Sequence, residues 1–331
     1  MLYVTTRSNC ETYTAARTLT ADTAPDGGLF VPFQIPRISF EALQGHTQET
    51  IIAYVLGLFF RTKLSEEAVL SSLGGTPLRR QNIDRKVTVA QLWNSRRRSF
   101  ARMEYDLYCK LCLEVPPCAK VTQWPKIAIR IAVLTALIAS EGREVDVAVN
   151  AGDFLSPMAA YYCRQMGIPI GKILCVTNEN SNLWDFFTHG ELDCGVSLQQ
   201  TSLPQLDVTQ PSQLERLIFD VSGLHSAKKF AAHMQLGDLY KCDDLRATAE
   251  NFAVSVVSTQ RVPSVIHRIY RSNGYVLDPY TALTFGGLQD YRATSFEIRQ
   301  TLLLAENSPT EYRTAVATAL GVPEFKLSDL V

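Results

Sequence analysis

From about residue 124 onward, the sequence alternates between short apolar runs and longer segments with helical periodicity. The predicted strands lie at 144–150 (EVDVAVN), 172–178 (KILCVTN), 252–258 (FAVSVVS) and 301–305 (TLLLA). The predicted helices lie at 125–140 and 155–166, and later helices end near 272, begin near 279 and end near 320. Apolar runs that alternate with helices are typical of parallel strands buried on both faces. This part of the chain therefore predicts an α/β fold, with a Rossmann-like, mostly parallel sheet covered by helices on both faces.

The residues before this alternation differ in character. Residues 1–92 are predicted to form a separate N-terminal domain, in which APDGGLFVPFQIPRI (24–38) is a glycine turn followed by short extended pieces between prolines. A helix is predicted after Ser65, which is a typical N-cap residue followed by two glutamates. Residues 93–123 mix charged and aromatic residues without a clear period, so they are predicted to be a junction before an α/β domain at 124–331.

Two later helix starts are predicted from capping boxes, in which a Ser or Thr precedes a Glu by three residues. The first pairs Ser212 with Glu215 in PSQLE. The second pairs Ser308 with Glu311 in SPTE, with Pro309 at the first helical position, where its missing N–H is harmless.

Net charge and hydropathy exclude several classes of partner. The formal net charge is −1 and the isoelectric point is about 6.5, so no overall field attracts nucleic acid or anionic lipid. The one basic run, Arg96-Arg97-Arg98, favours a solvated helix face over an RNA-binding patch. The longest apolar run (127–139) contains Arg130 and is too short to span a bilayer, so it predicts a buried helix. We expect a cytoplasmic protein without a signal peptide, membrane segment or nucleic-acid partner.

The cysteines do not form a clear metal-binding pattern. The chain has 8 cysteines scattered along its length, which suits a reducing compartment. Cys109, Cys112 and Cys118 are close in sequence, but a zinc site needs a fourth ligand and no histidine is nearby. We therefore expect free thiols and no metal.

Several segments resemble the motifs of one enzyme family, in that family's order. They are YVTTR (3–7) with APDGGLFVPFQIP, AAYYCRQMGIPIGKILCVTNENSNLWDFFTHGELD (159–193), PSQLERLIF (211–219), NGYVLDPYTAL (273–283) and AENSPTEY (305–312). The last three are similar to the family patterns SNFERLLF, YGYLLDPHTAV and STASPYKF. The chain as a whole resembles the threonine synthases.

This resemblance implies a pyridoxal-phosphate enzyme with the tryptophan-synthase-β-like fold. Enzymes of this family convert O-phosphohomoserine and water into threonine and phosphate, and they need a lysine that forms a Schiff base with the cofactor. The family segment HGPT-AFKD, which supplies that lysine, is not found in this sequence, and neither is the substrate-facing SGDTG loop. CAKVTQWPKI (118–127) resembles a family segment that lies far downstream of the lysine, so a piece of whole-domain size, most of the smaller cofactor-closing domain, is predicted to be missing.

Three lysines near the predicted junction are candidates to replace the missing one: Lys110, Lys120 and Lys126. A Schiff-base lysine requires a lowered pKa and a fixed pocket. Lys126 replaces an arginine of the family pattern, which indicates a structural position, and Lys110 has no matching context. We therefore expect all three to be ordinary solvated lysines.

The strand-to-helix loop VNAGDFLSP (149–157) resembles the family loop VPTGNFGDI, which cups the cofactor phosphate. Gly152 and Phe154 are kept, but Asp153 replaces an amide, and a carboxylate beside a phosphate is unfavourable. Leu155 replaces a second glycine and brings a Cβ close to the phosphate position. Ser156 keeps one hydrogen-bond donor, although a helix N-cap is its simpler role.

Three further positions belong to the predicted site. Glu306 stands where the family has a Thr or Ser near the pyridine nitrogen of the cofactor. Asn178 and Asn180, in TNEN, follow a predicted strand at the edge where open α/β sheets bind ligands. The simpler interpretation is that both asparagines satisfy backbone groups of a turn.

The segments that match the family pattern are those expected to form the core and the helix starts. The segments that are altered or missing are those that bind the cofactor and carry out catalysis in the family. We therefore expect a threonine-synthase-like protein that is catalytically inactive and acts by binding, with no cofactor, or pyridoxal phosphate if any. One alternative is an active pyridoxal-phosphate lyase or synthase with a reassigned lysine. Another is a sensor for a small amino acid or phosphate ester. Loss of a domain would expose apolar surface, which predicts self-association or a complex with a related enzyme.

Overall fold

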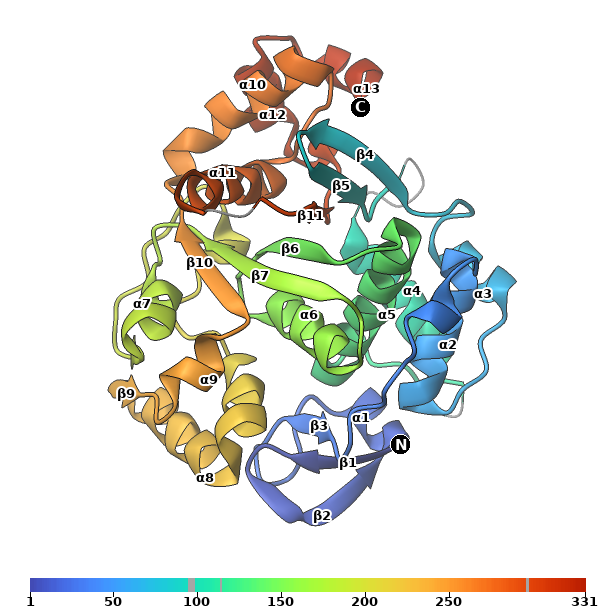
Figure 1. Ribbon diagram of the computed structural model, residues 1–331, viewed down its shortest axis with the longest axis vertical. Coiled ribbons are helices and arrows are strands. Elements are labelled where there is room, and N and C mark those ends of the chain that lie inside the picture. Colours follow the sequence, from blue (N-terminus) through green and yellow to red (C-terminus); the bar gives the residue numbers. More distant parts are fainter. Residues whose placement is uncertain (95–98, 114, 296–297) are drawn as a thin grey trace.

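The computed structural model describes residues 1–94, 99–113, 115–295 and 298–331 (Figure 1). Its centre is a six-stranded sheet in the order β10-β7-β6-β11-β5-β4. The strands are β4 (Arg79–Asp84), β5 (Val87–Gln91), β6 (Val145–Asn150), β7 (Ile170–Thr177), β10 (Phe252–Val256) and β11 (Thr301–Ala305). All neighbouring pairs are parallel except β4 with β5. The predicted α/β class with a mostly parallel sheet is therefore confirmed.

Helices cover both faces of this sheet (Figure 1). On one face α5 (Gln123–Glu141) and α6 (Leu155–Gln165) pack together, and on the other α11 (Pro279–Thr294) crosses β6, β7 and β11. Side chains alternate along β6 accordingly, because Val147 and Val149 join the α5–α6 core while Ala148 joins the core beneath α11. The four predicted strands and the helices α5 and α6 begin and end within two residues of the predicted bounds, and α11 begins where predicted.

The N-terminal part forms a separate three-stranded antiparallel sheet. Its order is β2-β1-β3, made by β1 (Leu2–Thr5), β2 (Ser8–Thr14) and β3 (Phe30–Pro32). The helices α1 (Ala15–Thr20), α2 (Gln48–Phe60) and α3 (Glu66–Ser72) follow, and α2 packs on α5. Tyr3 links the two parts, because its hydroxyl donates to Phe59 O (2.9 Å) and accepts from Trp124 Nε1 (3.0 Å). The two parts therefore share one apolar core.

Strands β4 and β5 extend the central sheet, although they lie before residue 92 in sequence. Leu303 of β11 pairs with Val89 of β5 on one side and with Ala148 of β6 on the other. The sheet therefore draws on both the predicted N-terminal domain and the predicted α/β domain. The domain boundaries at residues 92 and 123 stay a prediction.

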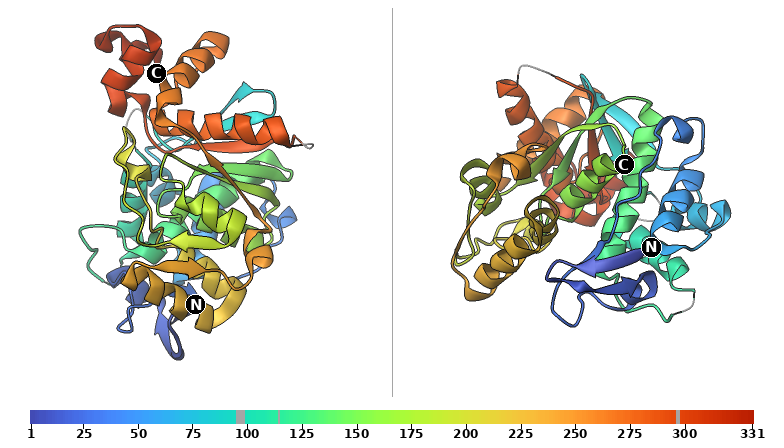
Figure 2. Two further views of the ribbon diagram at one scale, coloured as in Figure 1. Left: turned by 90° about the vertical axis from the view of Figure 1, so that its left-hand side faces the viewer. Right: turned by 60° about the horizontal axis from the view of Figure 1, so that its bottom comes forward.

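The remaining helices and strands surround the sheet. They are α4 (Phe100–Leu111), α7 (Asn182–His189), β8 (Glu191–Asp193), α8 (Leu214–Leu236), β9 (Leu239–Lys241), α9 (Leu245–Ala249), α10 (Val262–Asn273), α12 (Arg313–Leu320) and α13 (Leu327–Leu330). Short 3₁₀ turns lie at Glu41–Leu43, Pro204–Leu206, Thr259–Arg261, Pro309–Tyr312 and Glu324–Lys326. The start of α8 lies beside the N-terminal sheet (Figure 2), where Arg216 Nε donates to Phe30 O (3.1 Å). The turn and α13 after residue 320 were not predicted.

The predicted helix starts have mixed outcomes. Ser65 caps α3 as predicted, since its hydroxyl accepts from Ala68 N (3.1 Å). The capping box of Ser212 with Glu215 is wrong, because α8 begins at Leu214 without a side-chain cap. Ser308 accepts from Thr310 N (3.3 Å), so it starts the 3₁₀ turn that precedes α12.

Candidate functional site

A cleft of about 410 Å³ lies at the carboxyl ends of β6 and β11. This is the point where the strand order reverses, since β6 leads outward to β7 and β10 while β11 pairs with β5 on the opposite side. Open α/β sheets bind their ligands in the crevice at such a switch point. The residues that follow β6 and β11, including Gly152 and Glu306, line the cleft. The structure thus brings these two predicted site residues together.

The loop after β6 is a sharp turn into α6. Gly152 has φ 43° and Phe154 has φ 68°, in the left-handed region that non-glycine residues rarely adopt. The Phe154 ring is fully buried and packs on Phe187 and Phe252, with ring centroids 5.8 and 5.5 Å apart. Core packing therefore holds the strained Phe154 backbone, and Phe154 serves the turn rather than the cleft.

Asp153 lines the cleft, but its carboxylate is engaged with the segment before α8. Its Oδ1 accepts from Ser212 N (2.5 Å), and its Oδ2 accepts from Ser212 Oγ (2.8 Å) and Gln213 Nε2 (3.4 Å). This explains why Ser212 does not cap α8. The replacement of an amide by Asp153 thus ties the loop to a distant segment.

Four side chains form a buried ion network at the start of α6. Ser156 Oγ donates to Glu306 Oε1 (3.0 Å) and accepts from Arg130 Nε (3.1 Å). Arg130 Nη2 lies 3.4 Å from Glu306 Oε2, and Arg130 Nη1 is paired with Glu104. The guanidinium also lies over the Phe100 ring, 4.8 Å from its centroid. Burial lowers the pKa of Arg130, and Glu306 opposes this shift by its charge.

The network matters because the N-terminus of a helix attracts anions. In this protein the Glu306 carboxylate lies at the first turn of α6 and is already hydrogen-bonded by Ser156. Arg130 neutralises that carboxylate from within the protein. An anion bound at this helix start would therefore meet the chain's own glutamate.

The residues of the cleft do not fit pyridoxal phosphate. The charged side chains that line it are Lys126, Arg130, Glu104, Asp153 and Glu306, which gives two cations against three carboxylates and a net charge of −1. A phosphate dianion would face this negative balance at close range, where each unit-charge pair at 4 Å is worth about 4 kcal/mol. It would also have to displace Glu306 from Ser156. We derive no chemistry through this cofactor.

Lys126 is the one candidate lysine that reaches the cleft. It lies on α5 one turn before Arg130, is half-buried, and has no carboxylate partner among the described residues. Lys120 instead pairs with Asp22 (3.3 Å), and Lys110 lies in the last turn of α4. The structure thus separates Lys126 from the other two.

Two further groups in this region are buried. Tyr280 lines the cleft and its hydroxyl accepts from Gln205 N (3.4 Å), while burial raises the pKa of Tyr280. Asp278 caps α11 by accepting from Tyr280 N (3.0 Å) and Thr281 N (3.2 Å). Burial raises the pKa of Asp278 to about 6.

Asn178 and Asn180 lie at the end of β7 with their amides engaged inside the protein. Asn178 Nδ2 donates to Thr201 Oγ1 (3.0 Å) and Asp207 Oδ1 (2.7 Å). Asn180 Nδ2 donates to Gln199 O (2.9 Å), and its Oδ1 accepts from Gln199 N (2.9 Å). Both residues therefore hold the loop around residues 199–207 against the sheet, outside the cleft.

The cysteines and the basic run lie apart from the cleft. Within the described ranges all eight cysteines are free thiols, and no group of His, Cys, Asp or Glu is placed to hold a metal ion. Burial raises the pKa of the Cys112 thiol. Arg96-Arg97-Arg98, predicted to be a solvated helix face, lies outside the described residues. No helix in the described part of the chain is both long and apolar enough to cross a membrane.

The network residues Glu104 and Arg130 were not predicted to be part of the site. The sequence does indicate that Arg130 is unusual, because it is a single charged residue within a long apolar run. The α4 segment also had a signal, since Phe100, Met103, Leu107 and Leu111 recur at helical spacing and are buried.

Comparison with known proteins identifies the N-terminal part. The family "Threonine synthase N terminus" matches residues 2–73. "Threonine synthase-like 1" of Homo sapiens is 32% identical over 149 residues, which is 44% of this chain and 20% of that protein. "Threonine synthase" of Corynebacterium glutamicum is 28% identical over 215 residues, which is 58% of this chain and 44% of that protein. The chain thus matches between a fifth and less than half of the length of these relatives.

Solved structures extend the likeness to the whole fold. A PLP-bound threonine synthase from Brucella melitensis superposes with a TM-score of 0.81 at 18% identity, over 100% of this chain and 94% of that one. Threonine synthase from yeast gives a TM-score of 0.80 at 18% identity, over 100% and 94%. At this identity the likeness shows the fold, and the predicted tryptophan-synthase-β-like architecture agrees with it. The loss of a domain-sized piece stays a prediction.

Proposed function

Because the chain carries a threonine synthase N-terminal domain and is a divergent relative of the threonine synthases, we propose that it is a binding protein without threonine synthase activity. One observation carries the proposal: Glu306, Arg130, Glu104 and Ser156 bond to one another in the cleft where the sheet would bind a ligand. A catalytic site has polar groups directed at a substrate. Here those groups are paired with one another.

The loop between β6 and α6 supports the same proposal. Gly152 still makes the turn into α6, while Asp153 secures the start of α8. The features that remain around the loop are therefore those that stabilise the fold.

A second candidate function rests on Lys126. Its amine lines the same cleft and is not held by a carboxylate among the described residues, so it is placed to form a Schiff base with an aldehyde. This is the pyridoxal-phosphate lyase or synthase with a reassigned lysine. This function would require the Glu306 side chain to move away from the start of α6.

Reductive trapping separates the two candidates. The purified chain is mixed with pyridoxal phosphate, reduced with borohydride and digested, and the lysine peptides are analysed by mass spectrometry. Our proposal predicts no stoichiometric label on any lysine of the cleft. A stoichiometric label on Lys126 that is lost in Lys126→Arg but kept in the control Lys120→Arg would establish the second candidate instead.

Partners and location belong to the same proposal. We propose that the chain works in the cytoplasm and associates with a copy of itself or with a related enzyme. Support comes from large apolar side chains that are left open to solvent: Phe33, Leu236 and Phe325 are 69%, 74% and 74% exposed. We propose no metal and no resident cofactor.

A further inference from the structure

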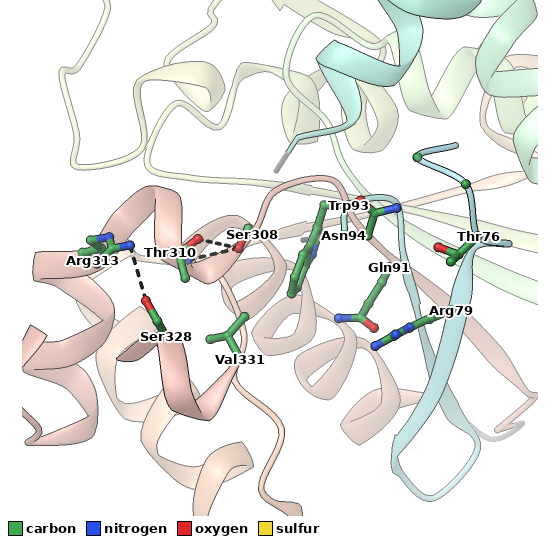
Figure 3. Close-up of a pocket in the computed structure, with 12 residues that line it drawn as sticks. Thr76, Arg79, Gln91, Trp93, Asn94, Ser308, Thr310, Arg313, Ser328 and Val331 are labelled. Atoms are coloured by element: carbon green, nitrogen blue, oxygen red, sulfur yellow. Dashed lines mark hydrogen bonds between the residues drawn. The ribbon is translucent and has the colours of Figure 1, made fainter. Parts of the chain in front are cut away.

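A second cavity, of about 430 Å³, lies one strand further along the same edge of the sheet. Its walls come from the segment after β5, the segment after β11 and the C-terminal helices, with Trp93 and Ser308 among its lining (Figure 3). These are again carboxyl ends of parallel strands, where α/β sheets bind ligands. The cavity shares no lining residue with the cleft of Glu306.

The charge of this cavity is positive. Arg79 of β4 and Arg313 of α12 lie at opposite ends of it (Figure 3), and both are exposed. Neither forms an ion pair with a carboxylate of the described residues, and no Asp or Glu side chain among those residues lines the cavity. Arg313 makes only a long hydrogen bond, from Nη2 to Ser328 Oγ (3.4 Å). Val331, the last residue of the described chain, also lines the cavity, so its carboxylate offsets one of the two arginines and an excess of one positive charge remains to favour an anion.

Trp93 stands between the two arginines (Figure 3). Its Nε1 is buried and has no hydrogen-bond acceptor among the described residues. An indole N–H can only donate, and a buried donor without an acceptor costs about 1–3 kcal/mol. The indole ring also offers a flat apolar surface to an aromatic or planar group.

We propose that this cavity binds a small organic anion whose flat apolar part packs on Trp93 and whose acid group is bound by Arg79 or Arg313. Thr76 lies on the side of Arg79, and Ser308 and Thr310 lie on the side of Arg313 (Figure 3), so each end of the cavity has a hydroxyl group beside its arginine. The recognised chemistry is an acidic group, phosphate or carboxylate, on a planar organic body. This site is independent of the cleft, so it holds whether or not the cleft binds pyridoxal phosphate.

The test uses the full chain labelled with ¹⁵N and follows its indole N–H signals by NMR. The three tryptophans report different places: Trp93 lines the cavity, Trp124 is buried and bonded to Tyr3, and Trp184 is on α7. The chain is titrated separately with phenyl phosphate, benzoate and inorganic phosphate. We expect the two aromatic anions to shift the Trp93 signal more than inorganic phosphate does. The signal is assigned by its absence in Trp93→Phe.

Variants of the arginines make the test specific. Replacement of an arginine that bonds the acid group, in Arg79→Gln or Arg313→Gln, is expected to weaken binding by roughly tenfold or more. Arg17→Gln, which removes an exposed charge from α1, should leave the affinity unchanged. Binding of phenyl phosphate or benzoate supports the site. The ligand with the higher affinity shows whether the site prefers a phosphate or a carboxylate. The proposal is overturned if neither shifts Trp93, if both arginine variants bind as the unaltered chain does, or if inorganic phosphate binds equally well.

Discussion

Arg130 holds the ion network of the cleft together. It is 9% exposed and contacts Glu104, Glu306 and Ser156 at once, from three separate helices or strand ends. A buried charge is tolerated only when it is paired and hydrogen-bonded. Removal of this one cation leaves Glu104 and Glu306 facing each other without compensation.

We expect Arg130→Met to lower the free energy of unfolding by about 3–5 kcal/mol, because it leaves an uncompensated buried carboxylate. Urea denaturation followed by circular dichroism measures the change. The matched control is Arg102→Met on α4, whose exposed side chain forms a 3.7 Å ion pair with the half-buried Asp106 and should contribute less than about 1 kcal/mol. Adding Glu104→Gln to Arg130→Met should recover part of the loss. Equal effects of Arg130→Met and Arg102→Met would contradict the buried network.

Asp278 gives a prediction that depends on pH. Burial raises its pKa from 3.8 to about 6, so the folded protein binds the proton more tightly than the unfolded chain. The unfolded chain therefore releases the proton first as pH rises, and the contribution of Asp278 to stability falls between about pH 4 and pH 6. Asn at this position keeps the helix cap but cannot titrate.

The stability of the unaltered chain relative to Asp278→Asn is expected to fall by on the order of 3 kcal/mol between pH 4 and pH 6, and then to stay level. Chemical denaturation at a series of pH values gives this difference directly. A difference that rises over this range would show that the carboxylate is stabilised in its charged form. Asp290→Asn, an exposed carboxylate of the same helix paired with Arg261, is the control.

At the scale of the element, the loop between β6 and α6 shows how one substitution changes its role. Asp153 connects this loop to the segment before α8 by three hydrogen bonds from Ser212 and Gln213. Glu215, at the start of α8, then pairs with Arg7 (3.0 Å) of the N-terminal unit. A position expected to face a phosphate therefore connects three parts of the fold.

Asp153→Ala is expected to destabilise the protein by about 1–3 kcal/mol, since it removes an acceptor from charge-assisted hydrogen bonds. Asp153→Asn keeps one carbonyl acceptor for Ser212 N and should cost less. Hydrogen exchange should show faster exchange at the start of α8 in the alanine variant, with no change in α10. Unaltered exchange at α8 would mean that the loop does not hold this helix.

The sequence predicted the elements whose pattern is local and missed those that depend on distant partners. Strand β11 (TLLLA) is a fully buried apolar run, so its range was predicted without error. Strand β4 is an antiparallel edge strand of which only Ile83 is buried, so its polar sequence gave no strand signal. For the cleft, Gly152 and Glu306 came from the family pattern, whereas Glu104 and Arg130 become neighbours only when α4, α5 and β11 pack.

At the scale of the whole molecule, the N-terminal unit and the central sheet share one core, and the polar cleft lies on the edge of that sheet. The exposed apolar side chains Phe33, Leu236 and Phe325 belong to three different segments. We therefore expect any contact between copies of the chain to use surfaces other than the cleft.

Self-association is predicted to appear in sedimentation velocity as a species heavier than the 36.9 kDa chain. Its proportion should rise with protein concentration and should change little with salt, because the contact is apolar. Leu236→Ser should reduce it if the end of α8 takes part, and Leu113→Ser, which exposes a polar group elsewhere, is the comparison. A single species of 36.9 kDa at every concentration would contradict the prediction.

We propose that the ion network of Glu306, Arg130, Glu104 and Ser156 keeps pyridoxal phosphate from binding in the cleft. The most direct test is an equilibrium titration of the unaltered chain with pyridoxal phosphate, followed by visible absorbance. We expect only the spectrum of the free cofactor, with no saturable band. A band that saturates at one cofactor per chain would contradict this expectation. It would show that the Glu306 and Arg130 side chains move to admit a bound phosphate.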